Sequence, residues 1–403
     1  MRILVVTQQY WPESWRIVDT CEELAKRGHH VTVLCGLPND QEGNLLPEYE
    51  NKANWKQERN GVHIIRVSDH PRKKGDLSLY FKYFSFAHRG IRAAKKLPGD
   101  FDVVLLNQLS PVMQGKPAIA YAKKWNKKIF MYCQDIWPES LSARHIVDSG
   151  LTKFIYRHYL KVSKKVYGAM DKILVTSPRY VDYLRDICLV KADKLGYLPQ
   201  YAEGLFYQPA LPKIDQSRKH NFVFAGNIGR EQDVETIVRA ADLLKENKEI
   251  AIHIVGSGSD LNNVKKLVES LKTDNVFFHG RVPVEQIPGI YAASDALLVT
   301  FAKDSLTPYV LPAKLQTCMA SGKPIIAAAV GAVADVITDA KCGVAVAPGD
   351  FVALAREIEK TVSCDPEILK VFSVNAQNYA KVHFDRASYF SKLQEALEGL
   401  LIR

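Results

Sequence analysis

The sequence predicts an α/β protein built from two doubly wound, Rossmann-like domains that face a central cleft. Short apolar runs of strand length alternate with helix-like stretches along the whole chain, a pattern typical of parallel sheets with helices on both faces. The 403 residues suffice for two domains of ordinary size. The stretch 199–219 is rich in proline and polar residues and has no clear period, so it marks the expected join.

These observations give domain boundaries and a place for the site. We expect an N-terminal domain over 1–200 and a C-terminal domain over 201–384, with a last helix at about 385–403 packing back on the first domain. Ligands of doubly wound sheets bind beyond the carboxyl ends of the strands. Two such domains in series leave a cleft between them, and that cleft is the expected site.

The expected strands are short runs of apolar residues. In the first half they are 2–6, 30–34, 63–67, 102–106, 129–132 and 172–176. In the second half they are 221–226, 251–256, 276–280, 296–301, 323–328 and 342–346. Helical stretches lie between them, such as 15–28, where Gly28 is a plausible C-cap.

Composition indicates an ordinary globular protein, with 47% hydrophobic and 24% charged residues. No apolar run approaches the roughly 20 residues of a membrane span, and the apolar run 2–6 is too short for a signal peptide. The seven cysteines are scattered, without a C-x-x-C pair or histidines at metal spacing. We therefore expect a cytoplasmic protein with reduced thiols.

The net charge of +10 is uneven along the chain. Residues 1–200 hold 32 Lys and Arg against 20 Asp and Glu, whereas residues 201–403 hold 22 against 24. The basic first half is expected to favour an anionic surface, which leaves a membrane, a lipid phosphate or a nucleic acid open as its partner.

The stretch AGNIGREQD (225–233) has the layout of a phosphate cradle. Gly226 and Gly229 lie in a turn between an apolar strand and an amphipathic helix. No Gly-Lys-Ser/Thr and no G-x-G-x-x-G is present, so it is neither a Walker motif nor a dinucleotide fingerprint. One interpretation is that backbone N–H groups at the helix N-terminus hold a diphosphate. The alternative is a plain strand–helix turn.

A second candidate stretch, 304–326, predicts a helix that starts at Pro312 and ends at Gly322. Lys314 on its first turn is able to reach an anionic ligand, the alternative being a solvated lysine. Arg281 and Val282 follow another predicted strand, where a base or a sugar can dock.

A third stretch, 131–141, follows a buried strand and carries Gln134, Asp135 and Glu139 at the cleft-facing end. A carboxylate there suits binding an acceptor hydroxyl or taking its proton. The alternative is helix capping by Asp135. Among the histidines only the nearby His145 is of interest, and a structural role explains it more simply.

The stretch 77–97 mixes aromatic and basic residues, as an interfacial membrane helix does. Phe81, Lys82, Phe84 and Arg89 are its expected membrane-surface residues. The alternative is a packed domain helix with a solvated basic face. No nucleic-acid recognition motif accompanies it, so no nucleic-acid partner is expected.

One D-x-D sequence, 100–102, opens a strand instead of closing one. It would lie at the wrong end of the sheet for chemistry, so no metal is assigned to it.

Taken together, these residues resemble the retaining glycosyltransferases of family 4, which have the GT-B fold. The resemblance covers nearly the whole chain and is closest to the bacterial group that includes the L-fucosamine transferases of surface-polysaccharide synthesis. The motifs that carry it are, in order, QQYWPESWRI, AKRGHHVTVLCGLPNDQEG, NQLSP, CQDIWPESL, YLPQYAE, GNIGREQD and LPAKLQTCMASGKPI.

The resemblance implies that the second domain holds a nucleotide-sugar, usually a UDP-sugar, and the first holds the acceptor. It implies glycosyl transfer with retention, without a metal or other cofactor, by same-face attack in which the departing phosphate takes the acceptor proton. The expected sugar is an N-acetylated amino or deoxyamino sugar. The expected acceptor is an undecaprenyl-diphosphate-linked saccharide, which places the protein peripherally on the inner face of the membrane in capsule, O-antigen or exopolysaccharide synthesis.

The implied donor-binding residues combine the glycine turn with basic and polar groups that follow other strands. They are Gly226, Asn227, Ile228, Gly229, Gln232, Arg281, Val282, Tyr309, Lys314, Thr317 and, from the first domain, Arg16. Gln134, Asp135 and Glu139 are the implied catalytic group.

The chain departs from the family pattern at several of these positions. Many relatives carry an arginine and a lysine where Asn227 and Gln232 stand, and two glutamates where Tyr309 and Thr317 stand. Many also have a histidine at the position of Gln134. Lys314, Arg281 and Arg16 are the expected substitutes for the missing positive charge. Two alternatives stay open, a UDP-sugar 2-epimerase-like isomerase and a non-catalytic nucleotide-sugar-binding partner.

Overall fold

The computed structural model describes residues 1–40, 43–70, 76–142, 150–211, 213–214, 218–303 and 306–402, with the backbone alone for 76–83, 141–142 and 150–152. These residues form two compact units. The first comprises 1–198 together with 390–403, and the second comprises 199–389. Within the described residues no helix combines the length and the apolar character needed to cross a bilayer.

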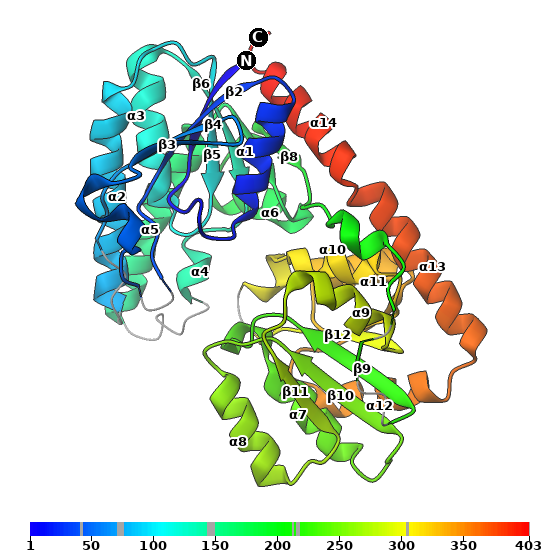
Figure 1. Ribbon diagram of the computed structural model, residues 1–403. Helices are drawn as coiled ribbons and strands as arrows, with labels where there is room; N and C mark the ends of the chain where they lie inside the picture. The colour runs from blue at the N-terminus through cyan, green and yellow to red at the C-terminus, as the bar shows by residue number, and fades with distance from the viewer. Residues whose placement is uncertain are drawn as a thin grey trace. The chain divides into compact units, whose positions relative to one another are not determined.

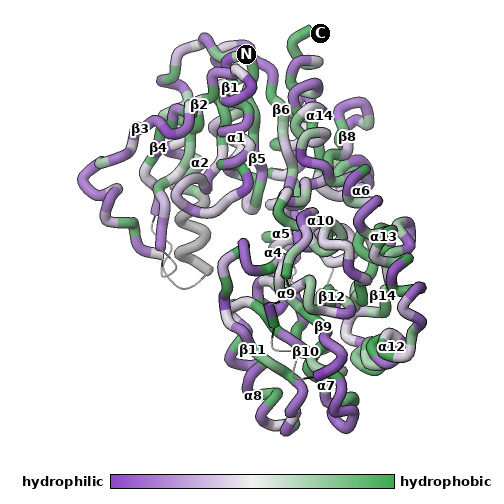
Figure 2. Tube along the Cα trace, turned by 45° about the vertical axis from the view of Figure 1, so that its right-hand side comes forward, coloured by the Kyte–Doolittle hydropathy of each residue, from purple (hydrophilic) through white to green (hydrophobic). Residues whose placement is uncertain are grey.

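The first unit contains an eight-stranded sheet in the order β3-β4-β2-β1-β5-β6-β7-β8. Its strands are β1 (Arg2–Val6), β2 (His30–Cys35), β3 (Lys56–Arg59), β4 (Val62–Arg66), β5 (Val103–Gln108), β6 (Lys128–Cys133), β7 (Lys172–Val175) and β8 (Leu195–Tyr197). All neighbours are parallel except β3, which pairs antiparallel with β4 at the edge. Figure 2 shows hydrophobic residues along the central strands such as β5 and β6, because helices cover both faces of a parallel sheet.

The helices of the first unit connect these strands (Figure 1). They are α1 (Arg16–Lys26), η1 (Pro47–Lys52), α2 (Asp76–Lys96), η2 (Val112–Gly115), α3 (Lys116–Trp125), α4 (Glu139–Ser142), α5 (Gly150–Gly168), α6 (Pro178–Asp182), η3 (Tyr183–Ile187) and η4 (Ala192–Lys194). The predicted first helix ends at its C-cap Arg27, and Gly28 follows with φ +87°, which is the left-handed position that favours glycine after a helix.

Helix α14 (Arg386–Glu398) leads the chain from the second unit into the first. Its Phe390 is fully buried, and the Arg27 guanidinium lies 5.5 Å from the centre of the Phe390 ring. Residues 390–403 therefore contribute apolar contacts to the first unit.

The second unit contains a six-stranded, all-parallel sheet in the order β11-β10-β9-β12-β13-β14. Its strands are β9 (His220–Ala225), β10 (Ile250–Val255), β11 (Val276–Gly280), β12 (Ala296–Thr300), β13 (Ile325–Ala328) and β14 (Gly343–Val346). Its helices are η5 (Gly204–Tyr207), η6 (Arg230–Gln232), α7 (Val234–Leu243), α8 (Leu261–Leu271), η7 (Val284–Gln286), α9 (Ile287–Ala292), η8 (Thr307–Tyr309), α10 (Ala313–Ala320), α11 (Ala332–Ala340), α12 (Phe351–Val362) and α13 (Pro366–His383).

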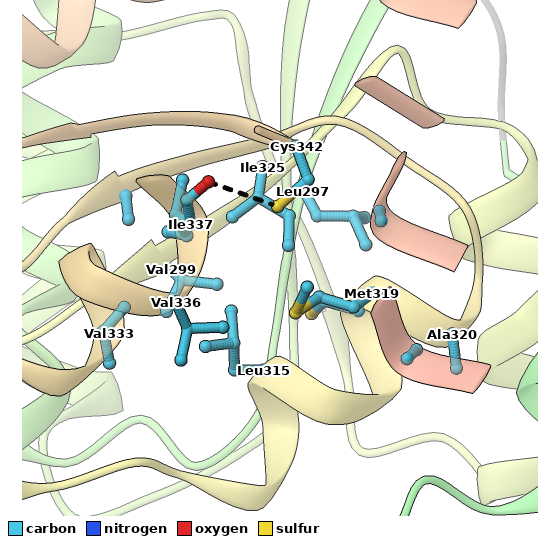
Figure 3. Close-up of a cluster of buried hydrophobic side chains, with 14 of the residues drawn as sticks. Leu297, Val299, Leu315, Met319, Ala320, Ile325, Val333, Val336, Ile337 and Cys342 are labelled. Carbon is cyan, nitrogen blue, oxygen red and sulfur yellow. Dashed lines mark hydrogen bonds between the residues drawn. The ribbon is translucent and has the colours of Figure 1, made fainter. Parts of the chain in front are cut away.

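Two apolar cores lie on the two faces of this second sheet. Along β12, Leu297 and Val299 belong to one core and Ala296 and Leu298 to the other, as expected for a strand buried on both sides. Figure 3 shows the first of these cores. Side chains from α10 and α11 pack there against the strands, among them Leu315, Met319, Val333, Val336 and Ile337. This packing fixes the position of α10, which also carries Lys314.

The sequence therefore predicts the fold class correctly, since both units are doubly wound α/β domains with parallel sheets. Strands β3 and β8 are the differences. The β3 sequence Lys-Gln-Glu-Arg contains no apolar residue because it forms an exposed antiparallel edge. Strand β8 is only three residues long.

Candidate active site

A pocket of about 350 Å³ opens in the second unit at the carboxyl ends of β9, β10 and β11. This is the edge of a parallel sheet where ligands bind. Eight residues line the pocket, from the end of β10, the loops after these strands and the start of α9: Gly226, Asn227, Val255, Gly256, Ser257, Arg281, Val282 and Ile287.

The glycine turn that forms one wall is joined to a second glycine loop. The N–H groups of Gly226 and Ile228 donate to the carbonyls of Val255 and Ser257, each at 2.9 Å. A Cβ on Gly256 would lie 1.9 Å from the Gly226 carbonyl oxygen, so only glycine fits this contact. The loop 256–258 is a part of the site that the sequence analysis missed, although its two glycines directly follow an apolar strand.

The turn differs from the predicted cradle at a helix N-terminus. Helix α7 begins only at Val234, after η6 and after Asp233, whose φ is +45°. The N–H groups of Gly226 and Ile228 are used by the β10 loop, and the Ile228 side chain is fully buried in the core. Ile228 therefore supports the turn by packing and does not face a ligand.

Lys314 lies beside the glycine turn, where the sequence analysis expected it. Its Nζ donates to Oε1 of Gln232 and lies 4.5 Å from the centre of the Phe224 ring and 5.5 Å from that of Phe301. A Cβ on Gly226 would be 3.4 Å from this Nζ. The alternative of a solvated lysine is therefore wrong, because the ammonium is held between two aromatic rings.

Burial between these rings lowers the pKa of Lys314 to about 8. The lysine is mostly charged at neutral pH, but its ammonium has lost much of its hydration. The backbone carbonyl of Gln232 accepts from the Thr300 hydroxyl at 2.5 Å, which ties this residue to the end of β12. The cation is thus held against the turn by Phe224 of β9, Gln232 of η6 and Phe301, which follows β12.

The other predicted donor residues are placed as follows. Asn227, Arg281 and Val282 line the pocket, with Asn227 and Arg281 exposed. The Thr317 hydroxyl donates to the Lys314 carbonyl at 2.8 Å, one turn back in its own helix. Gly229 lies buried in the turn, and Tyr309 is partly buried in η8. Arg16 belongs to the first unit, at the start of α1, and its part in donor binding stays a prediction.

The carboxyl edge of the first sheet carries the predicted carboxylates. The Ser110 hydroxyl donates to the Asp135 carboxylate, and its oxygen lies 2.7 Å from that of Ser140. Gln134 follows β6, and its Nε2 donates to Oδ1 of Asn107 at the end of β5. The serines and the asparagine were not among the predicted site residues, although Asn107 and Ser110 lie in the quoted NQLSP motif.

The Glu139 carboxylate is engaged in hydrogen bonds within the first unit. Its Oε1 accepts from the hydroxyls of Tyr183, at 3.0 Å, and Tyr156. Burial and the adjacent Glu139 carboxylate raise the pKa of Tyr183. These two tyrosines, from η3 and α5, hold the first residue of α4 in place. His145 lies outside the described residues.

The D-x-D sequence lies at the amino end of β5, as predicted. Asp102 accepts the Arg2 backbone N–H at 2.7 Å, and Asp100 pairs with the Arg2 guanidinium at 2.5 Å. Among the described residues no group of three or more His, Cys, Asp or Glu side chains is able to hold a metal ion.

Helices α2 and α3 pack side by side in the first unit (Figure 1), and Lys95, Lys116, Lys123 and Lys124 on them form a basic face. Phe86 is fully buried, so this part of α2 is a packed domain helix. Phe84 is half-buried with the Lys116 ammonium 5.9 Å from its ring centre, and Arg89 is exposed and donates to Ser68. The side chains of Phe81 and Lys82 lie outside the described residues.

Between these two helices lies an apolar pocket of about 680 Å³ whose rim is basic. Its lining comprises three apolar residues and four lysines: Ile91, Ile119, Ala120, Lys95, Lys116, Lys123 and Lys124. This pocket is larger than the one at the second sheet, but it holds no acid, base or nucleophile besides the lysines.

Comparison with protein families assigns both halves of the chain. Residues 14–200 match the family model described as Glycosyltransferase Family 4, and residues 212–379 match that of Glycosyl transferases group 1. Among curated relatives, the probable glycosyltransferase WbjE of Pseudomonas aeruginosa is 28% identical over 323 residues, which is 76% of each chain. The putative colanic acid biosynthesis glycosyl transferase WcaI of Escherichia coli is 24% identical over 80% of this chain and 82% of its own.

Solved structures share the fold over the whole chain. The sucrose-phosphate synthase of Thermosynechococcus elongatus superimposes with a TM-score of 0.78 at 19% identity, over 100% of this chain and 99% of that one. Anabaena HepE in complex with UDP gives 0.72 at 14% identity over 99% and 100%. WaaG, a glycosyltransferase involved in lipopolysaccharide biosynthesis, gives 0.72 at 16% identity over 98% and 100%. The chain thus carries a glycosyltransferase family 4 domain followed by a glycosyltransferase group 1 domain, on the GT-B fold.

Proposed function

We propose that this protein transfers a glycosyl group from a UDP-sugar to a lipid-diphosphate-linked saccharide during synthesis of a bacterial surface polysaccharide, with retention of configuration. The observation that carries the proposal is the Lys314 ammonium held beside the glycine turn, next to a pocket at the carboxyl edge of the second sheet. The similarity to HepE, which binds UDP, supports the nucleotide-sugar donor. The similarity to WcaI of colanic acid biosynthesis and to WaaG of lipopolysaccharide biosynthesis supports the surface-polysaccharide setting.

The proposed donor chemistry is electrostatic. A diphosphate beside Gly226 would take the Lys314 ammonium from its present partner, the neutral amide of Gln232. A cation that has already lost water interacts more strongly with a developing negative charge and needs little reorganisation. Arg281, exposed on the rim, supplies a second positive charge. We propose that these two side chains offset the charge of the leaving UDP without a metal.

The proposed acceptor chemistry uses the first unit. Asp135 would accept a hydrogen bond from the acceptor hydroxyl and orient it, while Ser110 holds the carboxylate in place. The departing phosphate of the donor would take the proton, so Asp135 positions the acceptor and need not remove the proton itself. The bond formed is the new glycosidic C–O bond, and the bond broken is that between the sugar and the UDP oxygen.

The acceptor and the sugar are the finer parts of the proposal. A lipid-linked acceptor would bring the protein to an anionic membrane surface, which suits the lysine-rimmed pocket between α2 and α3. Similarity to the L-fucosamine transferase-like group favours an N-acetylated amino or deoxyamino sugar.

The test begins with the nucleotide. Thermal unfolding would be measured with UDP, GDP, TDP, ADP, NAD and several UDP-sugars, each with and without EDTA. A ligand at 100 times its Kd stabilises a protein by about 2.7 kcal/mol. Selective stabilisation by UDP that survives EDTA is expected. A response confined to another nucleotide, or one abolished by EDTA, would contradict the donor site proposed.

The second step is turnover with the best UDP-sugar and an undecaprenyl-diphosphate saccharide. Transfer of the sugar to the lipid is expected. NMR of the product should show that the anomeric configuration is retained. Conversion of the UDP-sugar in the absence of acceptor would instead identify an isomerase. Binding of UDP with no turnover on any acceptor would identify a binding partner.

A further inference from the structure

We propose that a hydrogen-bonded chain of Asn221, His253 and His279 positions Arg281 and Val282 for the donor. The chain runs from Asn221 near the amino end of β9, through His253 in β10, to His279 near the carboxyl end of β11, and neither histidine lines the pocket itself. The inference rests on the proposed function, because it assigns a role to the residues that shape the same nucleotide pocket.

The first observation is a β-bulge at the end of β11. His253 lies opposite Phe277 and Ile254 opposite Phe278, but Val255 lies opposite Gly280. The register therefore shifts by one residue between Phe278 and Gly280, and His279 is the extra residue of β11. Such a bulge bends its strand and redirects the residues that follow, and bulges occur often beside active sites.

The residues after the bulge are those that enter the pocket. Gly280 has φ +65°, and its carbonyl accepts the Gly256 N–H at 2.7 Å. Arg281 and Val282 come next and line the pocket together with Gly256. The direction of this segment therefore depends on what holds His279.

The second observation is the direction of the hydrogen bonds. The Nδ2 of Asn221 donates to the Arg218 carbonyl at 3.2 Å, so its Oδ1 is the atom that faces His253 Nε2, at 3.0 Å. His253 must then carry its proton on Nε2, which leaves Nδ1 as an acceptor. His279 Nε2 lies 3.0 Å from this Nδ1 and donates to it.

The third observation is burial. His253 is 1% exposed, and its ring stacks on that of Phe277 with centroids 5.4 Å apart. An imidazole nitrogen left without a partner at this depth is costly, so His253 accepts one orientation and one tautomer. Through it the bulged residue of β11 is tied to Asn221 on β9, the strand that leads into the glycine turn.

The experiment compares two substitutions at the bulge. His279→Phe keeps an aromatic ring and removes the N–H, whereas His279→Gln keeps an N–H donor at similar reach. UDP binding to the full-length protein would be measured by titration calorimetry. We expect about tenfold weaker binding by His279→Phe and recovery to within about threefold of wild type by His279→Gln. His383→Gln, at an exposed position near the end of α13 in the same unit, is the control and should bind UDP as wild type does.

A double-mutant cycle separates positioning from general damage. If His279 acts through Arg281, the loss caused by His279→Phe should largely disappear in an Arg281→Ala background. Full additivity of the two losses would overturn the proposal. So would wild-type UDP affinity in a folded His279→Phe protein, or equal losses in His279→Phe and His279→Gln.

A measurement on the wild-type protein covers the case in which His279→Phe does not fold. Nitrogen NMR of labelled histidines should show His253 protonated on Nε2 alone, with a ring N–H shift of His279 on addition of UDP. Protonation of His253 on Nδ1, or a His279 signal that ignores UDP, would overturn the proposal. Failure of wild type to bind UDP at all would instead contradict the proposed function.

Discussion

The carboxyl edges of the two sheets show how differently two halves with similar folds prepare for chemistry. The first half carries the excess of positive charge, yet the group proposed to position the acceptor at its sheet edge is the Asp135 carboxylate. The second half has slightly more acidic than basic residues, yet its edge carries a half-buried lysine and an exposed arginine. The net charge of each half is therefore opposite in sign to the charge of the side chains proposed to act at its sheet edge. Net charge reports the surface that a domain presents, and a few positioned side chains decide the chemistry.

The largest effect should come from removing the cation of the second edge. Lys314→Ala leaves the proposed diphosphate without its nearest positive charge, and we expect turnover to fall by about 100-fold or more. Initial rates and UDP affinity would be measured together.

Lys360→Ala is the matched control, because Lys360 is an exposed lysine of the same unit. Near-normal turnover by Lys314→Ala would remove this lysine from the site.

The negative charge of Asp135 at the first edge should matter for transfer to the acceptor and not for donor binding. Asp135→Asn keeps the shape of the side chain and weakens its interaction with an acceptor hydroxyl. We expect turnover to fall by roughly 10- to 100-fold, with UDP affinity within about twofold of wild type. Ser110→Ala, which only frees the carboxylate to move, should cost less.

The matching measurement is UDP binding by calorimetry beside turnover with the lipid acceptor. Equal losses in UDP binding and in transfer would place Asp135 on the donor.

The low pKa of Lys314 predicts that UDP affinity at the second edge depends on pH. Its pKa in the folded protein, about 8, lies below the ordinary value of 10.5, so the free protein releases this proton as pH rises from 8. An anion binds the charged form. UDP affinity should therefore fall above pH 8, by up to about tenfold per pH unit. The stability of the unliganded protein should change in the opposite sense, rising between pH 8 and 10.5 because the folded state favours neutral lysine.

Lys314→Arg is the control for this profile, because arginine stays charged throughout the range. Its UDP affinity should be flat from pH 7.5 to 9.5. An equal decline in both proteins would assign the profile to another group.

Comparison of the two edges also shows which site residues can be predicted from the sequence and which cannot. Gly226 and Lys314 are 88 positions apart, yet they can be paired in advance because parallel strands bring all their carboxyl ends to one edge. The loop 256–258 cannot be predicted in the same way, because its glycines are required by backbone carbonyls of the glycine turn that only the folded structure brings close. The role of Ser110 is hard to predict for the same reason, since its partner Asp135 lies in the loop after the neighbouring strand β6. Residues whose partners are other protein atoms are therefore harder to recognise from the sequence than residues that face a ligand.

The smallest effect on chemistry, and the clearest on location, should come from the basic face of the first half. Changing Phe81, Lys82 and Phe84 together to Ser, or Lys116 and Lys123 to Glu, should release the protein from liposomes that contain anionic lipid. Each positive charge near such a surface contributes about 1 kcal/mol, so reversing two charges should weaken binding by at least 100-fold. Transfer to a water-soluble acceptor analogue should stay near wild type, because the donor pocket belongs to the other unit.

Lys360→Glu and Lys370→Glu, at exposed positions of α12 and α13 in the second unit, provide the control for net charge. If the control and the α3 variant leave the liposomes together, total charge governs binding. If neither leaves them, the basic face is a solvated surface and the first half meets its acceptor by another route.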